Sequence, residues 1–209
     1  MRLATPGHAF ALAIVIAIAV AGCGPSTTAT AVLVPTAAVV TPSTAPSARL
    51  ESGGGLTVKA DPALLDFIPD TPDGLEMFYD SDTTRQVAAD PALAKDAVGL
   101  AIALFTVTGA ATPADDLAIV SVVRLRDPSV GEGAYRTWRD TYDASACGPA
   151  GGVAGNAQST INGRIVYIGS CNGGVLTYHV RIRDGAIVVS VTSIGPMRLG
   201  EKVMKAIGP

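Results

Sequence analysis

Histidine and aromatic side chains are scarce in this chain, and their scarcity narrows the chemistry available to it. The 209 residues include two histidines, one tryptophan and 5% aromatic residues overall. His8 precedes an apolar N-terminal run, so His179 is the only histidine in the rest of the sequence. Histidine is the usual general base and metal ligand near neutral pH. Because His179 falls in the middle of an expected strand with no cleft implied, we predict no catalytic role for it.

The spacing patterns of metal and phosphate sites are also missing. The chain has no CxxC pair and no HExxH motif of the kind that zinc sites use. Oxygen-bearing side chains cluster at 80–84, but Arg85 stands where a calcium loop needs glycine, and Pro91 stands where it needs an acid. The glycines at 148–155 lack the lysine of a phosphate-binding loop. We expect no metal, no cofactor and no nucleic-acid partner.

The N-terminus carries an export signal. Met1-Arg2 is followed by an uncharged run of 13 residues at 9–21, which is too short to cross a bilayer. The run ends in the sequence VAGC at 20–23, which resembles the lipobox of bacterial lipoprotein precursors. This resemblance implies that residues 1–22 are a cleaved signal peptide and that Cys23 receives a diacylglyceryl group. The alternative is an ordinary signal peptide with a chance cysteine at its end.

The lipobox resemblance also implies a location. A doubly acylated Cys23 anchors a protein stably, whereas a single chain holds it only marginally. We therefore expect a lipid-anchored protein on the extracytoplasmic side of a bacterial membrane, in the cell envelope. Gly24 lacks the aspartate that resembles an inner-membrane retention signal, so the choice between two membranes stays open.

A linker follows the anchor. Of the 29 residues at 24–52, 20 are Ser, Thr, Pro or Ala, and four prolines prevent any helix. A tract this poor in aromatic groups buries too little surface to offset its ordering entropy. We predict a disordered tether at 23–55 that ends in Gly53-Gly54-Gly55, and a single folded domain at 56–209.

Two cysteines remain once Cys23 is assigned to the anchor. Cys147 and Cys171 form an even pair in a domain that we expect to be exported to an oxidising compartment. A disulfide between them is the natural prediction. A catalytic thiol or half of a metal site would need further ligands that the chain does not readily supply.

Turn and cap residues predict the order of elements. Asp61-Pro62 and Asp90-Pro91 each predict a helix start, and the second helix is expected to run from 91 to about 108. Strands are expected at 75–79 and 117–125, and a helix is expected after Gly133. On that helix Tyr135, Trp138 and Tyr142 form an aromatic stripe, which more often packs in a core than binds a ligand.

The C-terminal third predicts a four-stranded antiparallel meander with strands at about 156–161, 164–170, 175–183 and 186–194, followed by a helix from Pro196. Asp184-Gly185 as a two-residue turn pairs Tyr178 with Val191, and a turn at Asn172-Gly173 would pair Tyr178 with Tyr167. The first strand fits this register less well and is expected at an edge. The fold class is α+β, with a mainly antiparallel sheet and helices packed on one face.

The other face of this meander is expected to face solvent. It carries His179, Arg181 and Arg183, which we take as a candidate surface for an envelope protein or an anionic ligand. Residues 53–116 contain 11 acids against three bases, and residues 117–209 contain six acids against ten bases. Either the two halves neutralise each other across one surface, or they form a bipolar surface that recruits an anionic partner.

Three functions remain open at the level of the sequence. The leading hypothesis is a non-catalytic binding or interaction module. The first alternative is an envelope hydrolase that uses acids from the 61–82 region, which a pocket gathering two or more of them would support. The second is a carrier of a small apolar ligand, which an internal void lined by Phe105, Trp138 or Tyr178 would support.

Overall fold

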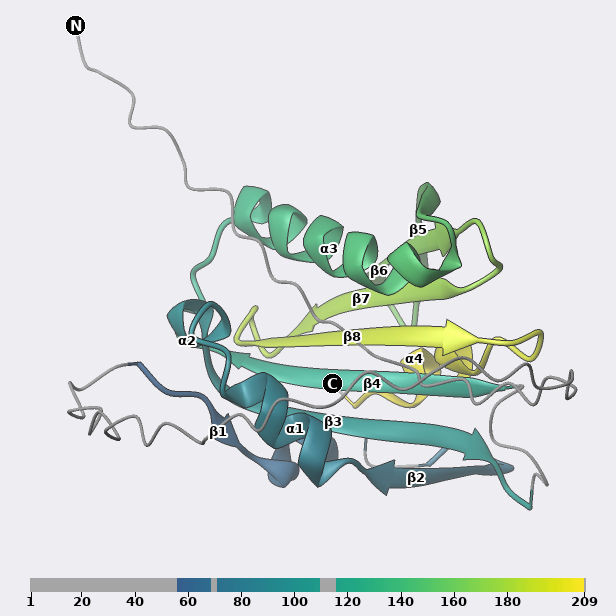
Figure 1. Cartoon of the computed structure of the whole chain (residues 1–209), viewed down its shortest axis with the longest axis horizontal. Helices are drawn as coiled ribbons and strands as arrows, with labels where there is room; N and C mark the ends of the chain where they lie inside the picture. Colours follow the sequence, from purple (N-terminus) through teal and green to yellow (C-terminus); the bar gives the residue numbers. More distant parts are fainter. Residues whose placement is uncertain (1–55, 69–70, 110–115, 209) are drawn as a thin grey trace, which may run out of the picture. The chain divides into compact units, whose positions relative to one another are not determined.

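Eight strands form one sheet in the part of the chain that the structure describes, which is residues 56–68, 71–109 and 116–208 of a computed structural model (Figure 1). The strands are β1 (Lys59–Ala60), β2 (Leu75–Tyr79), β3 (Ala97–Val107), β4 (Leu117–Leu125), β5 (Val153–Ile161), β6 (Arg164–Cys171), β7 (Leu176–Ile182) and β8 (Ile187–Ile194). The helices are η1 (Pro62–Phe67), α1 (Ser81–Ala88), α2 (Leu93–Asp96), α3 (Glu132–Cys147), η2 (Gly148–Ala150) and α4 (Leu199–Ala206). Cys23, the predicted signal peptide and the predicted tether lie outside the described residues.

The strands follow the order β1-β3-β4-β8-β7-β6-β5, and β2 also pairs with β3. Only β1 runs parallel to its neighbour, and every other pair is antiparallel. The predicted α+β class with a mainly antiparallel sheet is therefore confirmed. β5 ends the sheet and most of its residues are exposed, as the sequence predicted for the first strand of the meander.

The prediction of a helix at 91–108 is wrong over most of that range. Only α2 is helical, and the chain then enters β3, the longest strand of the sheet. Ala101, Ala103 and Phe105 pack into one apolar cluster, while Leu100 and Ile102 pack into another on the opposite face. A strand that is buried on both faces shows no alternation of polar and apolar residues, so its sequence resembles that of a buried helix.

The C-terminal meander is confirmed, with one correction to its register. β7 and β8 pair as predicted, with Tyr178 opposite Val191. Tyr178 lies opposite Ile168 rather than Tyr167, because Cys171 N–H bonds to the carbonyl of Val175 and the loop therefore holds three residues. A one-residue shift moves every side chain of a strand to the other face.

Helices cover both faces of the sheet, whereas the sequence suggested one. The face with Val180, Val189 and Val191 packs against η1 and α4. The opposite face, with Ile102 and Val188, packs against α1, α2 and α3. The meander face that was expected to be wet is therefore the face beneath α3 (Figure 1).

The Cys147–Cys171 disulfide confirms the predicted pairing. It joins the last residue of α3 to the last residue of β6, across a sequence separation of 24. The C-terminal end of α3 is thereby fastened to the sheet that it covers.

Asp80 fixes the start of α1. Its carboxylate accepts hydrogen bonds from the Thr83 N–H at 2.9 Å and from the Thr83 hydroxyl at 2.7 Å. Partial burial opposes the charge, but these bonds outweigh it and hold the pKa of Asp80 below its ordinary value. The buried Thr84 hydroxyl then donates to the Asp80 carbonyl and accepts from Ile102 N–H, which ties α1 to β3.

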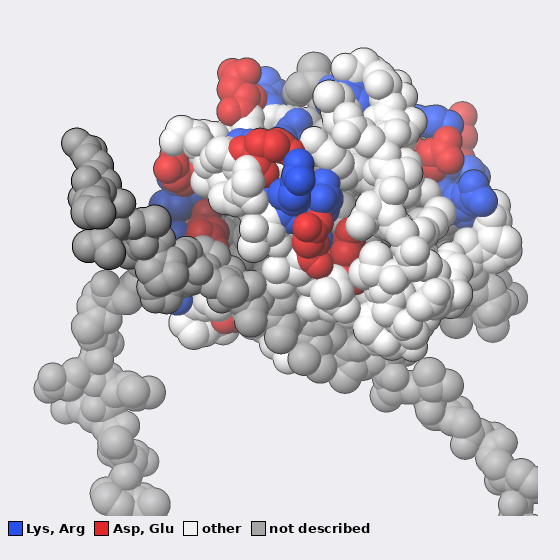
Figure 2. Space-filling model, turned by 90° about the horizontal axis from the view of Figure 1, so that it is seen from above, with Lys and Arg blue, Asp and Glu red and all other residues white. Residues whose placement is uncertain are grey.

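The acidic and basic halves of the domain meet in space. Asp61 lies within 4.0 Å of Arg124, although the two come from opposite sides of the charge split. Acidic and basic side chains also lie beside one another on the face seen in Figure 2. These observations favour mutual neutralisation over a bipolar surface.

Candidate binding site

The three residues of the predicted binding surface do not share one surface. His179 is fully buried, Arg181 is half-buried and Arg183 is exposed. The Arg181 guanidinium lies 5.3 Å from the ring of Tyr135 in α3, whereas Arg183 lies 5.5 Å from the ring of Phe67 in η1 on the other face. The prediction that His179 is exposed is wrong, because α3 packs over this face of the sheet.

His179 belongs to a sealed polar network. Its Nε2 lies 2.7 Å from Asp143 Oδ1, and its Nδ1 lies 2.9 Å from Ser190 Oγ. The Thr177 hydroxyl donates to the same Asp143 oxygen at 2.5 Å. The Tyr142 ring contacts His179 edge-on with ring centres 5.1 Å apart. Asp143 and Tyr142 come from α3, so the network links this helix to β7 and β8.

The network contains a serine, a histidine and an aspartate, the residue types of a hydrolase triad. His179, Ser190 and Asp143 are 0%, 2% and 2% exposed, so no substrate bond reaches the serine in this conformation. A nucleophile must meet its substrate at hydrogen-bond distance from its base. Burial of all three groups makes a structural role the better explanation for this arrangement.

The acids of the 61–82 region are dispersed. Asp61 pairs with Lys59 and Arg124, Asp80 caps α1, and Asp82 pairs with Arg85. Asp70 lies outside the described residues. No group of three or more His, Cys, Asp or Glu side chains placed to hold a metal occurs at 56–68, 71–109 or 116–208. Asp61, Asp80 and Asp82 are each engaged by a base or a helix terminus, so these three acids give no support to the hydrolase alternative.

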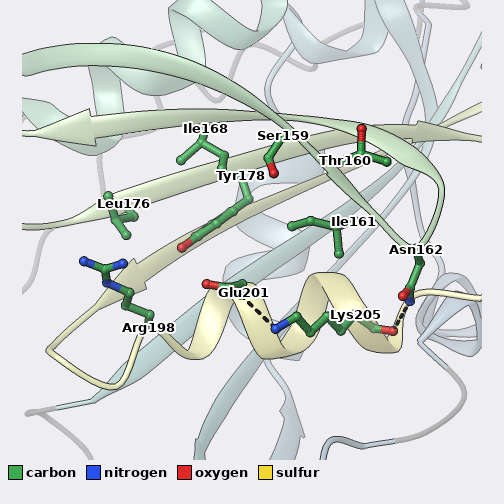
Figure 3. A pocket seen from close by; sticks show the side chains of 10 residues that line it. All are labelled: Ser159, Thr160, Ile161, Asn162, Ile168, Leu176, Tyr178, Arg198, Glu201 and Lys205. Atoms are coloured by element: carbon green, nitrogen blue, oxygen red, sulfur yellow. Dashed lines mark hydrogen bonds and ion pairs between the residues drawn. The ribbon is translucent and has the colours of Figure 1, made fainter.

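A groove of about 540 Å³ lies between α4 and strands β5 to β7 (Figure 3), and we call it the α4 groove. Apolar, aromatic and polar side chains line its sheet side, and the charged side chains of α4 and of Arg198, which precedes the helix, line the opposite side. Its residues are Ser159, Thr160, Ile161, Asn162, Ile168, Leu176, Tyr178, Arg198, Glu201 and Lys205.

Close packing brings α4 against the sheet beside this groove. Leu199 and Val203 are fully buried in the apolar cluster. Gly200 N–H donates to Ser193 Oγ at 3.0 Å, and a Cβ on Gly200 would lie only 2.7 Å from Tyr178 Cε2. A residue without a side chain is therefore needed at position 200.

One end of the α4 groove is closed by the β5–β6 turn. Asn162 adopts a positive φ of 49° in this turn, and its side-chain amide donates to the carbonyl of Lys205 (Figure 3). Arg164 donates to the carbonyls of Ile207 and Gly208 at 2.9 and 2.7 Å. These bonds fasten the turn to the C-terminal end of α4.

Some charged side chains of the groove form an ion pair and others do not. The hydrogen bond and charge of Lys205, with Nζ 2.8 Å from Glu201 Oε1, hold the pKa of Glu201 below its ordinary value. Burial, with the Glu201 charge, raises the pKa of the Tyr178 hydroxyl, and Arg198 opposes this. Arg198 makes no ion pair with any residue that the structure describes, although its charge also lowers the pKa of Glu201. We call its guanidinium, which is unpaired in this sense, the uncommitted charge of the groove.

The sequence did not indicate this groove, although it predicted the helix and strands that form it. The Glu201–Lys205 spacing is the one local signal of an ordered charged face on α4.

No protein-family model matches the chain, and no curated protein matches its sequence. None of the helices in the described ranges is long and apolar enough to span a membrane.

Proposed function

We propose that this protein is a lipid-anchored envelope lipoprotein whose folded domain binds an anionic ligand in the α4 groove without transforming it. The observation that carries the proposal is the groove itself, which combines an apolar floor with the uncommitted guanidinium of Arg198. Its volume of about 540 Å³ falls within the range of about 300–1,000 Å³ that is usual for small-molecule sites.

The lining residues favour a ligand with an anionic end and an apolar body. Ile161, Ile168 and Leu176 offer apolar contact, and Arg198 offers a planar donor that suits a carboxylate or phosphate. Lys205 is already paired with Glu201, so it adds little net positive charge. The proposed anionic site therefore differs from the one expected at Arg181 and Arg183, because neither residue lines the α4 groove.

The same residues argue for binding rather than catalysis. The groove contains no histidine and no cysteine, and the buried His179 network lies on the other side of the sheet. Catalysis by proton transfer requires a base within hydrogen-bond reach of the reacting group. Glu201, the one carboxylate of the lining, has a lowered pKa and is held by Lys205.

Octyl phosphate is a suitable probe of the groove, with octanol as its uncharged match. We expect Arg198→Ser to weaken octyl phosphate binding roughly tenfold or more, because a charge-assisted hydrogen bond contributes about 1.5–3 kcal/mol. Isothermal titration calorimetry measures the difference. Arg136→Ser, a change of the same charge at an exposed position on α3, should leave the affinity unchanged. Equal binding by the wild type and Arg198→Ser would contradict the proposal.

Membrane anchoring is tested separately in the native host. We expect the wild-type chain in the membrane fraction and the Cys23→Ser variant outside it, because two acyl chains supply a stable anchor. Mass spectrometry of the N-terminal peptide should show Cys23 as the first residue and carrying lipid. Membrane-bound protein with an unmodified Cys23 would overturn the anchoring proposal and would leave the groove proposal standing.

A further inference from the structure

A second hollow lies on the other face of the sheet, beneath α3. It has a volume of about 240 Å³, and we call it the α3 cavity. Its lining residues come from α2, β4, the loop before α3, α3 itself and β8. They are Asp96, Leu125, Val130, Gly133, Ala134, Tyr135, Thr137, Trp138 and Val188. The cavity shares no residue with the α4 groove.

Small side chains on α3 account for the unfilled space. Gly133, Ala134 and Thr137 line the cavity from the helix, whereas Leu125 and Val188 line it from the sheet. Gly133, Ala134 and Thr137 are exposed, so the cavity opens to solvent on the helix side, whereas Leu125 and Val188 are buried at its base. A concave, mainly apolar hollow that opens to solvent is the usual form of a small-molecule site.

Two residues that line this cavity each carry a buried polar atom without a partner. Tyr135 is 3% exposed, and its hydroxyl makes no hydrogen bond to any described residue. The indole Nε1 of Trp138 is also buried and unpaired within the described ranges. An indole N–H is only a donor, and a phenol both donates and accepts. Buried donors without acceptors are costly and rare in native proteins.

We propose that the α3 cavity binds a small, neutral, mainly apolar molecule that carries a hydrogen-bond acceptor, such as a medium-chain ketone or ester. The apolar walls hold the body of the molecule, and its carbonyl oxygen accepts from the Trp138 N–H, the Tyr135 hydroxyl or both. This goes beyond the anionic ligand of the α4 groove and assigns the domain a second site of different chemistry.

The charges around the cavity select against an anion. Asp96 is the only charged residue in its lining, and burial raises the pKa of this carboxyl while the charge of Lys95 opposes the rise. A ligand carboxylate would meet this acid and an apolar wall, with no basic side chain in the lining to pair with it. The two sites therefore discriminate by charge.

Trp138 makes the site directly observable. It is the only tryptophan in the whole chain, so tryptophan emission reports on the surroundings of this one side chain. Trp138 also lines a smaller void of about 40 Å³ beside Tyr142 and Ile102. A ligand in the α3 cavity changes the surroundings of the indole and should therefore shift its emission spectrum.

The test titrates 2-octanone into the purified full-length mature protein and follows Trp138 emission and calorimetric heat. We expect a saturable spectral shift and binding about three- to tenfold tighter than that of octane, since one neutral hydrogen bond accounts for that ratio. Octanoate, the charged match, should leave the Trp138 emission unchanged, and any heat that it gives should come from the α4 groove and be reduced in Arg198→Ser. No saturable response to 2-octanone, or equal binding of octane, would overturn the proposal.

Four variants separate the site from its surroundings. Ala134→Phe should fill the cavity and abolish 2-octanone binding, whereas Ala144→Phe, at an exposed position on the same helix outside the lining, should not. Tyr135→Phe keeps the ring and should bring the affinities for 2-octanone and octane closer together, which tests the proposal even where Ala134→Phe does not fold. Arg198→Ser should bind 2-octanone as the wild type does. Unchanged binding in Ala134→Phe would place the ligand elsewhere and overturn the assignment.

Discussion

Asp143→Ala should lower the free energy of unfolding by about 3 kcal/mol or more, because two buried groups lose their partner at once. His179 Nε2 and the Thr177 hydroxyl both bond to Asp143 Oδ1, and both residues are fully buried. Each buried polar group left unpaired costs about 1–3 kcal/mol. Urea denaturation followed by circular dichroism measures the loss.

Asp140→Ala is the matched control for this experiment. Asp140 lies on the same helix, is exposed and pairs only with its neighbour Arg139 among the described residues. Exposed ion pairs contribute about 0–1 kcal/mol, so this variant should stay close to the wild type. If Asp143→Ala were no less stable than Asp140→Ala, the buried network would not hold α3 to the sheet.

The double variant Cys147→Ser/Cys171→Ser should lose about 3 kcal/mol, the value that the chain-entropy model gives for a loop of this length. The disulfide constrains the unfolded chain and fastens the end of α3 to β6 in the folded one. Denaturation of this variant and of wild-type protein treated with dithiothreitol should give the same reduced stability. A variant as stable as the oxidised wild type would show that α3 is held by its packing and its buried network alone.

Strands that are bounded by strong turns could be predicted from the sequence. Asp184-Gly185 set the β7–β8 register correctly because a two-residue turn fixes the pairing on both sides. Asn172-Gly173-Gly174 did not set the β6–β7 register correctly, because these residues permit a loop of either two or three residues. The structure has the three-residue loop, in which Gly174 adopts a φ of +80°. The prediction of a helix over the residues that form β3 was wrong, because burial of both strand faces removes the alternation of polar and apolar residues that distinguishes a strand from a helix.

The candidate site was harder to predict than the fold. Thr177, His179 and Ser190 alternate with apolar residues, a pattern typical of a strand face in water. They are buried because α3, more than 30 residues earlier in the chain, brings Asp143 to meet them. The α4 groove likewise gathers residues from 159 to 205, and the β5–β6 turn meets α4 through the hydrogen bond from Asn162 to the carbonyl of Lys205.

The aromatic stripe of α3 is divided between core packing and the proposed α3 cavity, whose ligand stays a proposal. Tyr142 packs in the core against His179, as the commoner interpretation of such a stripe expects. Tyr135 and Trp138 line the α3 cavity, and the carrier alternative named Trp138 as one residue that would border such a void. One end of this helix face therefore packs in the core, and the other end borders the α3 cavity.

The position of β8 in the sheet bears on how the chain reaches its folded state. β8 lies between β4 and β7, so the sheet halves β1–β4 and β5–β7 meet only through the strand that comes last in the sequence. Contacts between segments so far apart close late and fold slowly. A chain that emerges N-terminus first must therefore keep one edge of β4 unpaired until residues 187–194 arrive. That edge stays exposed for the interval, which is when such a domain most needs a chaperone.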